Sequence, residues 1–364
     1  MQLALVRRQY PSRVLSVFTP FIAFGLTLLA GSIMFAAQGL DPLVTLYTYF
    51  VEPLIETWSL HELAIKAAPL ILIGVGLSVC FLSNNWNIGA EGQFVVGAIT
   101  GSALPVLWPD FANFATLPLM LLFGVLGGCA YACIPALLKT RFNTNEILTS
   151  LMLVYVAQLL LDWLVRGPWR NPEGFNFPET RIFNDAAILP ELFSEYGRAN
   201  WGIVFALVAA IGVWLMLRKT LKGFEVQVVG ASPRAGRFAG FSSSRMVFFA
   251  FGLSGALAGL AGIAEVAGAS GQLRPVISPG YGFTAIIVAF LGRLNPLGIV
   301  AAGLVLALTY LGGEAAQIAL GLSDKVVRVF QGMLLFFVLA TDTLIHYQVR
   351  VTGGTTAGDS RGDR

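Results

Sequence analysis

Ten apolar stretches, most of them long enough to cross a bilayer, dominate this 364-residue chain. A helix needs about 20 predominantly apolar residues to span the hydrocarbon core. Only 12% of the residues are charged, about half the share that is usual in soluble domains. The sequence therefore predicts an all-α polytopic membrane protein with eight to ten transmembrane helices. The expected spans are residues 14–37, 63–82, 88–107, 117–138, 147–165, 201–217, 247–268, 281–292, 296–317 and 327–345.

The charged residues predict how these spans are oriented. The basic N-terminus precedes an apolar run that is too long for a cleavable signal peptide, so we expect an uncleaved first helix. With ten spans, fifteen Lys and Arg residues fall on the side of the N-terminus and eight on the opposite side or at adjoining span ends. By the positive-inside rule we expect both termini in the cytoplasm. The expected organisation is a cytoplasmic tail (1–13), a transmembrane domain (14–345) and a disordered Gly/Thr-rich cytoplasmic tail (346–364).

A polar interruption at residues 83–97, SNNWNIGAEGQFVVG, lies between two apolar runs. Its polar residues include Asn84, Asn87, Glu91 and Gln93. Lipid cannot satisfy such groups, so the segment is either a loop at the membrane surface or a helix break that lines a protein cavity. The predicted orientation places it at the cytoplasmic ends of the flanking spans, or dipping into the membrane from there.

A second glycine-rich interruption, ISPGYGF, precedes the short eighth span and contains Ser278, Tyr281 and Phe283. Two broken spans in comparable positions indicate two weakly related halves. In transporters built from such halves, the broken helices typically form the substrate site. Amides, hydroxyls and aromatic rings suit a polar but uncharged permeant better than fixed charges do. We therefore expect the seven residues named at the two breaks to form the translocation pathway or gate. For each of them, helix packing or capping is an alternative.

Two connecting segments are long enough to carry a function of their own. Residues 166–200, expected outside, are rich in proline, aromatic and charged residues; they form either a cover or a docking surface for an external partner. Residues 218–246, expected in the cytoplasm, hold six basic residues and one acid. Within them Ser232 and Pro233 are typical of a helix start, and a helix over 234–239 would end at Gly240. A third segment, 38–62, is expected to hold an interfacial helix.

The motifs of several enzyme classes do not occur in the sequence. It lacks a Gly-x-x-x-x-Gly-Lys-Ser/Thr phosphate loop, His-Glu-x-x-His, Cys-x-x-Cys and Gly-x-Ser-x-Gly. We therefore expect no enzymatic activity, no metal and no cofactor in this chain, and ATP hydrolysis only in a partner. Glu91 and Glu265 are the ionisable residues best placed for an internal polar network, so an ion-coupled secondary transporter is the alternative.

Four motifs resemble the permeases of bacterial nucleoside and simple-sugar ABC importers, within the branched-chain amino acid/ribose permease family. They are NWNIGAEGQ (85–93), FNTNEI (142–147), VGASPRA (229–235) and SPGYGF (278–283). Together they run in family order from about residue 60 to 300. Phe241 and Ser242 depart from the family pattern, in which an aliphatic residue commonly follows the glycine.

The resemblance implies a permease subunit that carries a nucleoside, purine-like base or simple sugar through a bacterial inner membrane. The implied partners are a cytoplasmic ATPase, a second homologous permease in a heterodimer and an extracytoplasmic binding protein in which selectivity often resides, with no role for nucleic acid. The family's cytoplasmic loop transmits closure of the ATPase to the helices. In this sequence that role falls on Gly230, Ser232, Pro233, Arg234, Arg237 and Gly240.

Overall fold

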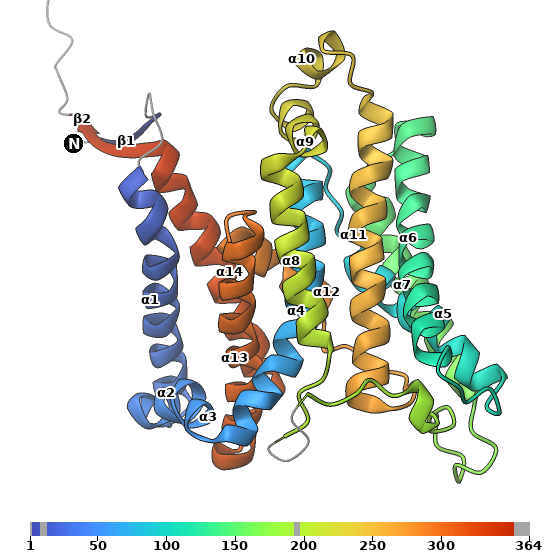
Figure 1. Cartoon of the computed structure of the whole chain (residues 1–364). Helices are drawn as coiled ribbons and strands as arrows, with labels where there is room; N and C mark the ends of the chain where they lie inside the picture. The colour runs from blue at the N-terminus through green and yellow to red at the C-terminus, as the bar shows by residue number, and fades with distance from the viewer. Residues whose placement is uncertain (1, 8–12, 193–196, 353–364) are drawn as a thin grey trace, which may run out of the picture. The chain divides into compact units, whose positions relative to one another are not determined.

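A computed structural model describes residues 2–7, 13–192 and 197–352, and it divides into two compact units that are treated separately below (Figure 1). The larger unit comprises residues 43–327 and the smaller one residues 1–42 and 328–364. The larger unit holds the polar breaks and both long connecting segments.

Helices make up almost all of the larger unit. They are α2 (Pro42–Phe50), α3 (Glu52–Ile55), α4 (Thr57–Leu82), α5 (Ala90–Leu107), α6 (Thr116–Phe142), α7 (Glu146–Arg166), α8 (Gly202–Lys219), α9 (Leu221–Ala231), α10 (Pro233–Phe238), α11 (Ser243–Glu265), α12 (Tyr281–Leu291), α13 (Pro296–Leu320) and the start of α14 (Asp324–His346). The 3-10 turn η1 (Asp185–Ala187) interrupts the segment before α8, and the π-helical turn η2 (Val266–Ser270) extends α11.

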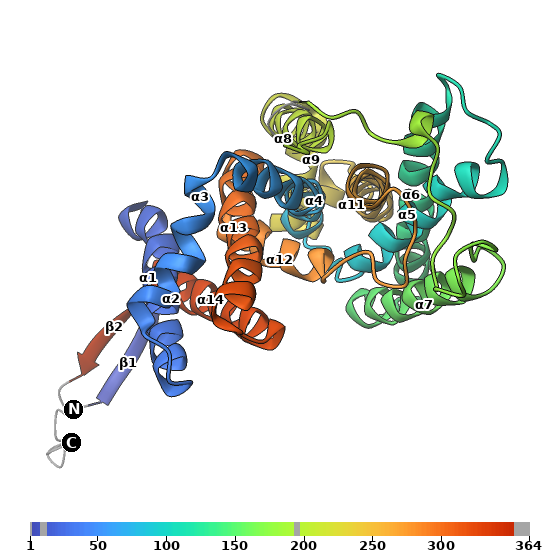
Figure 2. The same ribbon diagram turned by 90° about the horizontal axis from the view of Figure 1, so that it is seen from below.

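Helix α4 is the centre of this unit. It contacts α8, α11, α12 and α13, which surround it in the view from below (Figure 2). In its most apolar part 89% of the residues are buried, and its sequence there is apolar on every side. A helix that is hydrophobic all round is buried inside a protein or a bundle.

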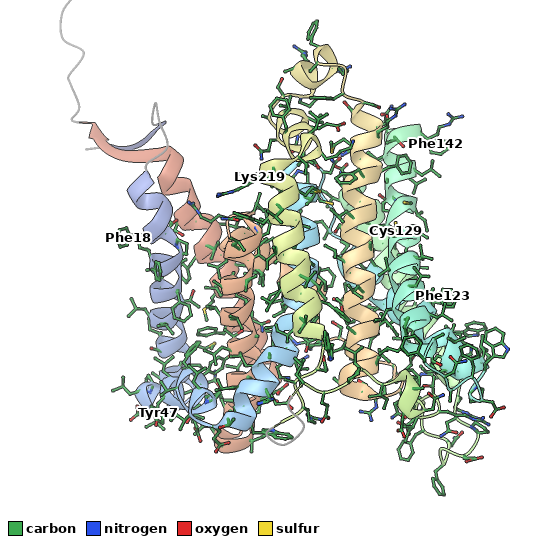
Figure 3. All side chains as sticks on the ribbon, in the orientation of Figure 1. Phe18, Tyr47, Phe123, Cys129, Phe142 and Lys219 are labelled. Carbon is green, nitrogen blue, oxygen red and sulfur yellow. The ribbon has the colours of Figure 1, made fainter. Side chains whose placement is uncertain are left out.

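Helices α6 and α11 pack closely because glycines line their contact. A side chain at Gly128 would overlap the Gly255 carbonyl oxygen, and one at Gly259 would overlap the Gly124 carbonyl oxygen. Such small residues, spaced four apart on both helices, let two backbones approach within a membrane. The outward face of α6 carries large apolar side chains instead, among them Phe123 and Phe142, which suit contact with lipid (Figure 3).

All ten predicted spans are helices, so the predicted fold class is confirmed. Among the described residues, eight helices are long and apolar enough to cross a membrane, and the apolar stretches of α12 and α14 are shorter. The segment predicted to hold an interfacial helix contains α2 and α3, and α4 begins at Thr57, six residues earlier than expected. At 11 residues, α12 is about 16 Å long and cannot span alone.

The smaller unit contains α1 (Arg13–Ala37), most of α14 and two short strands, β1 (Gln2–Arg7) and β2 (Tyr347–Thr352). The strands pair antiparallel, with Gln2 opposite Thr352. The prediction of a disordered tail over 346–364 was therefore wrong for the six residues of β2, and the tail predicted over 1–13 contains β1. β2 is rich in residues that favour strands whereas β1 is not, and neither strand is stable unpaired, so the pairing could not be predicted from either end alone. Residues 353–364 lie outside the described part.

Candidate functional site

The first polar break begins with a non-helical segment, residues 83–89, that turns back from the end of α4 and is buried except at Asn84, Trp86 and, in part, Ile88. Asn84 adopts a left-handed conformation (φ 56°), and the Asn85 N–H donates to the Cys80 carbonyl at 2.9 Å. Helix ends commonly close with such a left-handed residue, and Asn tolerates it well. Asn84 itself is exposed at this turn, so its observed role is to end α4 and reverse the direction of the chain.

Asn87 shows how far this segment enters the bundle. Its side chain bonds Ser254, which lies midway along α11 and against Gly76 of α4. Gly76 lies six residues before the end of α4, about 9 Å along the helix axis. The break is therefore a re-entrant segment within the protein, and the alternative of a plain surface loop does not describe it.

A closed set of amide hydrogen bonds holds the segment there. Asn87 and Gln93 donate to each other's side-chain oxygens at 3.0 Å, and Asn87 also donates to Ser254 Oγ at 3.0 Å. The Gly89 N–H donates to Asn87 Oδ1 at 3.0 Å, just before α5 begins. Asn87 is fully buried and Gln93 is 1% exposed. These two predicted pathway residues thus have their polar groups engaged within the protein.

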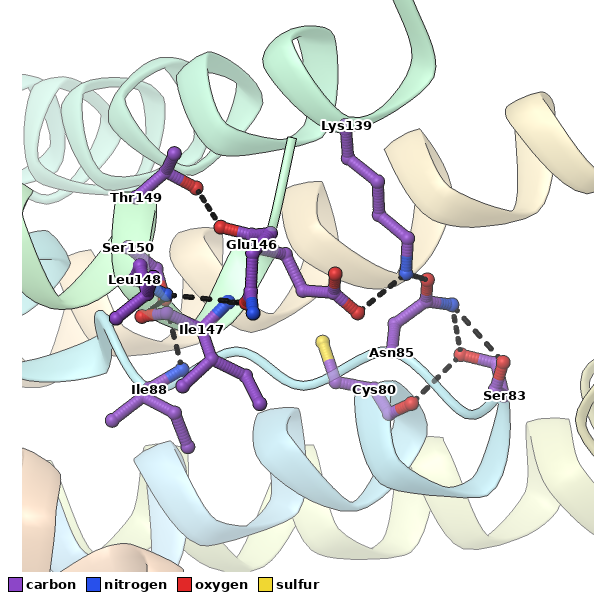
Figure 4. A network of polar contacts seen from close by, with 11 residues as sticks. Cys80, Ser83, Asn85, Ile88, Lys139, Glu146, Ile147, Leu148, Thr149 and Ser150 are labelled. Atoms are coloured by element: carbon purple, nitrogen blue, oxygen red, sulfur yellow. Dashed lines mark hydrogen bonds and ion pairs between the residues drawn. The ribbon is translucent and has the colours of Figure 1, made fainter. Parts of the chain in front are cut away.

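Lys139 ties the same segment to the junction of α6 and α7 (Figure 4). Its Nζ donates to Asn85 Oδ1 at 2.8 Å and to Glu146 Oε1 at 2.6 Å. Close by, the Ile88 N–H donates to Ser150 Oγ of α7 at 3.2 Å. From the sequence, Lys139 was visible only as a basic residue at a span end, and Ser254 did not stand out. Both lie far along the chain from the asparagines that they bind, Asn85 and Asn87.

The second break, residues 271–280 between η2 and α12, meets the first at the start of α12. Ser278 Oγ accepts from the N–H groups of Gly280 and Tyr281, at 3.0 and 2.9 Å, and so caps the helix. The Gly282 N–H donates to Glu91 Oε2 at 2.6 Å, which joins the N-termini of α5 and α12. A side chain at Gly282 would overlap the backbone of Glu91, so only glycine allows this approach. A carboxylate is favoured at a helix N-terminus, where the dipole is positive.

A cavity of about 430 Å³ lies beside this junction. Glu91 and Val95 of α5, residues 275–278 and one face of α7 line it. The α7 face contributes Tyr155, Gln158, Leu159, Leu161 and Asp162. Of the seven residues predicted for the pathway, the structure brings Glu91 and Ser278 to this cavity. Gln158 was not predicted from the sequence. It could have been, because it is a lone amide within an apolar helix, which indicates a side chain that does not face lipid.

Tyr281 and Phe283 lie on different faces of α12. Tyr281 is 4% exposed and packs edge-on against Phe94 and Tyr310, with ring centroids 6.2 and 5.5 Å apart. Phe283 is 40% exposed on the surface of the chain. Their predicted place in the pathway stays a prediction, and the structure adds a packing role for Tyr281.

Helices α9 and α10 cap the end of the bundle where α4 stops (Figure 1). Ser232 Oγ accepts from the Ala235 N–H at 3.3 Å, Pro233 is the first residue of α10, and Gly240 follows it with φ 82°. The predicted short helix and its glycine stop are confirmed at 233–238. Helix α9 was missed, because its glycines and the basic residues in and before it were taken as a loop; tertiary packing on α4 and α8 supports it.

Gly230 of α9 rests directly on the first polar break. A side chain there would overlap the Leu82 carbonyl oxygen and come within 3.1 Å of Ser83 Cα. Val229 in turn packs against Gly236 of α10. Arg234 and Arg237 are exposed on α10. The segment predicted to couple to an ATPase therefore contacts the residues from which the break begins.

The segment predicted as an external cover or docking surface is bound along η2 and the second break. The N–H groups of Thr180, Phe183 and Leu189 donate to carbonyls of residues 273, 271 and 267, at 3.1, 2.8 and 2.9 Å. The Leu273 N–H returns a bond to Thr180 Oγ1 at 3.0 Å. Residues 180–189 thus form an ordered strap that pairs with residues 267–273. Residues 193–196 of the same segment are outside the described residues.

Comparison with known proteins identifies the family. The model of the branched-chain amino acid transport system / permease component family matches residues 59–339. The chain is 35% identical to a glucose ABC transporter permease of Haloferax volcanii, over 98% of this chain and 96% of that protein. It is 26% identical to a nucleoside ABC transporter permease of Lactococcus lactis (88% and 90% covered) and 28% identical to a guanosine ABC transporter permease of Bacillus subtilis (90% and 94%).

Among solved structures, an inward-facing metal-chelate type ABC transporter covers 89% of this chain and 98% of its own at 15% identity. Its TM-score of 0.45 is too low to establish a shared fold. The family match and the full-length relatives are sufficient by themselves: this chain belongs to the branched-chain amino acid transport system permease family and is a multi-pass ABC transporter permease.

Proposed function

We propose that this chain forms the translocation pathway for a nucleoside or a simple sugar in an ATP-driven importer. The observation that carries the proposal is the contact of Gly230 in α9 with the Leu82–Ser83 backbone, because it joins a cytoplasmic surface to the polar break. The cargo class is supported by the glucose, nucleoside and guanosine permeases that the chain resembles along most of its length.

The chain would work as one part of a larger assembly. A separate ATPase supplies the energy, since the sequence has no phosphate loop, and neither enzymatic activity nor a cofactor is expected of this chain. A second permease completes the pathway, and paired permeases among the relatives support a heterodimer. An extracytoplasmic binding protein delivers the cargo, and both termini lie in the cytoplasm of the cell that carries it.

The structure suggests how movement of the ATPase would reach the pathway. Displacement of α10 is passed to α9 through the packing of Gly236 on Val229, and from α9 to residues 82–83. Asn85, two residues further, is held to the α6–α7 junction by Lys139. A displacement of α9 would therefore move the re-entrant segment and the N-terminus of α7 together. Glu91, at the start of α5, comes directly after this segment in the chain and would move with it. Packed helices transmit such shifts because interiors are dense and stiff.

The test is uptake by proteoliposomes that contain this chain with its ATPase, second permease and binding protein. We expect accumulation of labelled guanosine or D-glucose to require ATP and all four components. Purified alone, the chain should hydrolyse no ATP and support no uptake. Uptake by the chain alone, driven by a proton gradient and lost in Glu91→Gln, would overturn the proposal in favour of an ion-coupled transporter.

A further inference from the structure

We propose that the cavity beside Glu91 is a cargo-binding site of the permease itself, and that it binds the vicinal hydroxyl groups of a ribose or pyranose. This inference rests on the proposed function and adds to it a site and a recognition chemistry. The residues that would contact cargo are Glu91, Tyr155, Gln158, Asp162 and Ser278.

The shape of the cavity suits a small solute. Its volume of about 430 Å³ falls within the range of ligand sites, roughly 300–1,000 Å³. Five of its eleven lining residues carry a polar side-chain group, and the other six are Val95, Leu159, Leu161, Pro275, Val276 and Ile277. Ligand sites typically have such a mainly apolar wall with a few converging polar groups.

The polar groups match hydroxyls better than they match an ion. Carboxylate and amide oxygens accept hydrogen bonds from hydroxyls, and the Gln158 amide also donates. Glu91 already accepts from the Gly282 N–H, and Asp162 accepts from Arg166 Nε at 2.7 Å. Glu91 is therefore held in place by the backbone of α12, Asp162 is paired on the exposed face of α7, and each carboxyl group has further acceptor positions for hydroxyl donors. The Tyr155 ring adds an apolar surface for the face of a sugar or base.

The position of Gln158 argues against lipid as the normal neighbour of this wall. Gln158 is exposed on the chain, in the same face of α7 as Tyr155, which is 56% exposed. An amide in a membrane-spanning helix faces a bundle interior or a water-filled cavity, since hydrocarbon leaves it unsatisfied. This face is thus part of an aqueous path or lies against another subunit, as a pathway wall would.

The cavity also lies between elements that would move when the ATPase acts on α9 and α10. Glu91 follows the re-entrant segment held by Asn87, and Gln158 lies on the helix that Lys139 anchors through Glu146. Opposite walls of the cavity are therefore attached to the two elements that the coupling route would move. Movement at the cytoplasmic end would change the cavity and release the cargo.

The experiment measures weak binding to the permease–ATPase complex without the binding protein, so that the affinity of that protein does not mask the site. Saturation-transfer NMR is recorded with guanosine, D-glucose and their deoxy analogues. We expect binding in the millimolar range that weakens when a hydroxyl is removed. Gln158→Leu should weaken binding of the parent ligand about tenfold, the effect of one lost hydrogen bond, and reduce discrimination against a deoxy analogue.

Val156→Leu is the matched control, because Val156 is exposed on the same helix and does not line the cavity. Gln158→Asn, which keeps the amide, checks that a loss does not reflect misfolding and should restore part of the binding. Unchanged binding in Gln158→Leu, or no binding of either ligand to the wild-type complex, would overturn the inference. Binding that needs Na⁺ and is lost only in Asp162→Asn would overturn it in favour of a cation site.

These outcomes differ from a failure of the proposed function. If the four-component importer takes up neither guanosine nor D-glucose with ATP, the proposed function itself is wrong. If it transports one of them and the NMR measurement shows no effect of Gln158→Leu, only the cavity assignment fails.

Discussion

The two polar breaks of this permease differ in how much of their stabilisation comes from backbone pairing with another segment. The first break, before α5, is held by side chains: Asn87, Gln93 and Ser254 bond one another, and Lys139 anchors Asn85. The second break, before α12, combines two backbone bonds to the strap, from Thr180 and Phe183, with side-chain contacts that involve Thr180, Gln272 and Ser278. A segment buried among helices finds few free backbone partners, so side chains must supply them, whereas a segment under an extended strap can pair along its backbone.

Under the proposed function, the difference assigns the two breaks to two roles, transmission of movement and contact with cargo. Residues 83–89 of the first break are mostly buried, and residue 83 contacts α9, so under the proposed function this part suits transmission of movement. The second break has Val276 76% exposed at the cavity and suits contact with cargo. We therefore expect changes at the first break to affect stability and coupling, and changes at the second to affect mainly binding.

The largest effect is expected from Gly230→Val. A side chain at this position overlaps the Leu82 carbonyl oxygen, so α9 must move away from the first break. We expect ATP-driven uptake to fall at least about a hundredfold, while membrane insertion and ATPase assembly persist. Overpacking of this kind commonly costs about 1–3 kcal/mol.

Gly212→Val in α8 is the control, because nothing lies within 4 Å of a side chain built there. The measurement compares uptake with ATP hydrolysis in the same proteoliposomes. Normal uptake by Gly230→Val would remove α9 from the coupling route.

Asn87→Leu should have the next largest effect. It removes four hydrogen bonds from the first break and leaves Gln93 and Ser254 buried without this partner. Each such group costs about 1–3 kcal/mol, so the unfolding temperature of the detergent-solubilised complex should drop by several degrees, and uptake should be lost with it.

Thr180→Val tests the other side of the comparison. It removes one side-chain bond to the second break, while the backbone bonds of residues 180, 183 and 189 remain. We expect a smaller drop in unfolding temperature than for Asn87→Leu. Equal drops would show that side chains hold the two breaks alike.

Lys139→Met should uncouple the transporter with a moderate effect. Its side chain is 24% exposed and that of Glu146 is 16% exposed, so water partly replaces the lost bonds. Uptake per ATP hydrolysed should fall about tenfold at nearly normal unfolding temperature. Arg198→Met, which breaks the more exposed pair with Glu62, is the control and should leave this ratio unchanged. A normal ratio in Lys139→Met would mean that the first break is not linked to α7 in this way.

The smallest effect is expected from Asn84→Gly. Asn84 is exposed with a left-handed backbone, a conformation that glycine adopts without strain. Uptake should stay within about twofold of the wild type, since the residue acts through the turn. Asn84→Val should reduce uptake more, because a β-branched residue is strained there by about 1–2 kcal/mol. A strong loss in Asn84→Gly would indicate contact between the amide and cargo.

The sequence alone predicted features whose signals are local. The ten helices follow from the length of the apolar runs, and α10 from Ser232, Pro233 and Gly240, because caps and turns act within a few residues. The two polar breaks were visible for the same reason, since residues such as Asn87 and Glu91 cannot face hydrocarbon.

Only the tertiary structure decided what these residues contact. Asn87 and Ser254 are 167 positions apart, and Glu91 and Gly282 are 191 apart, so no pattern along the chain could pair them. The pairing of β1 with β2 likewise depends on the two ends of the chain meeting. The sequence specified which groups need partners within the membrane, and the packing of α4, α11 and α12 determined which partners they found.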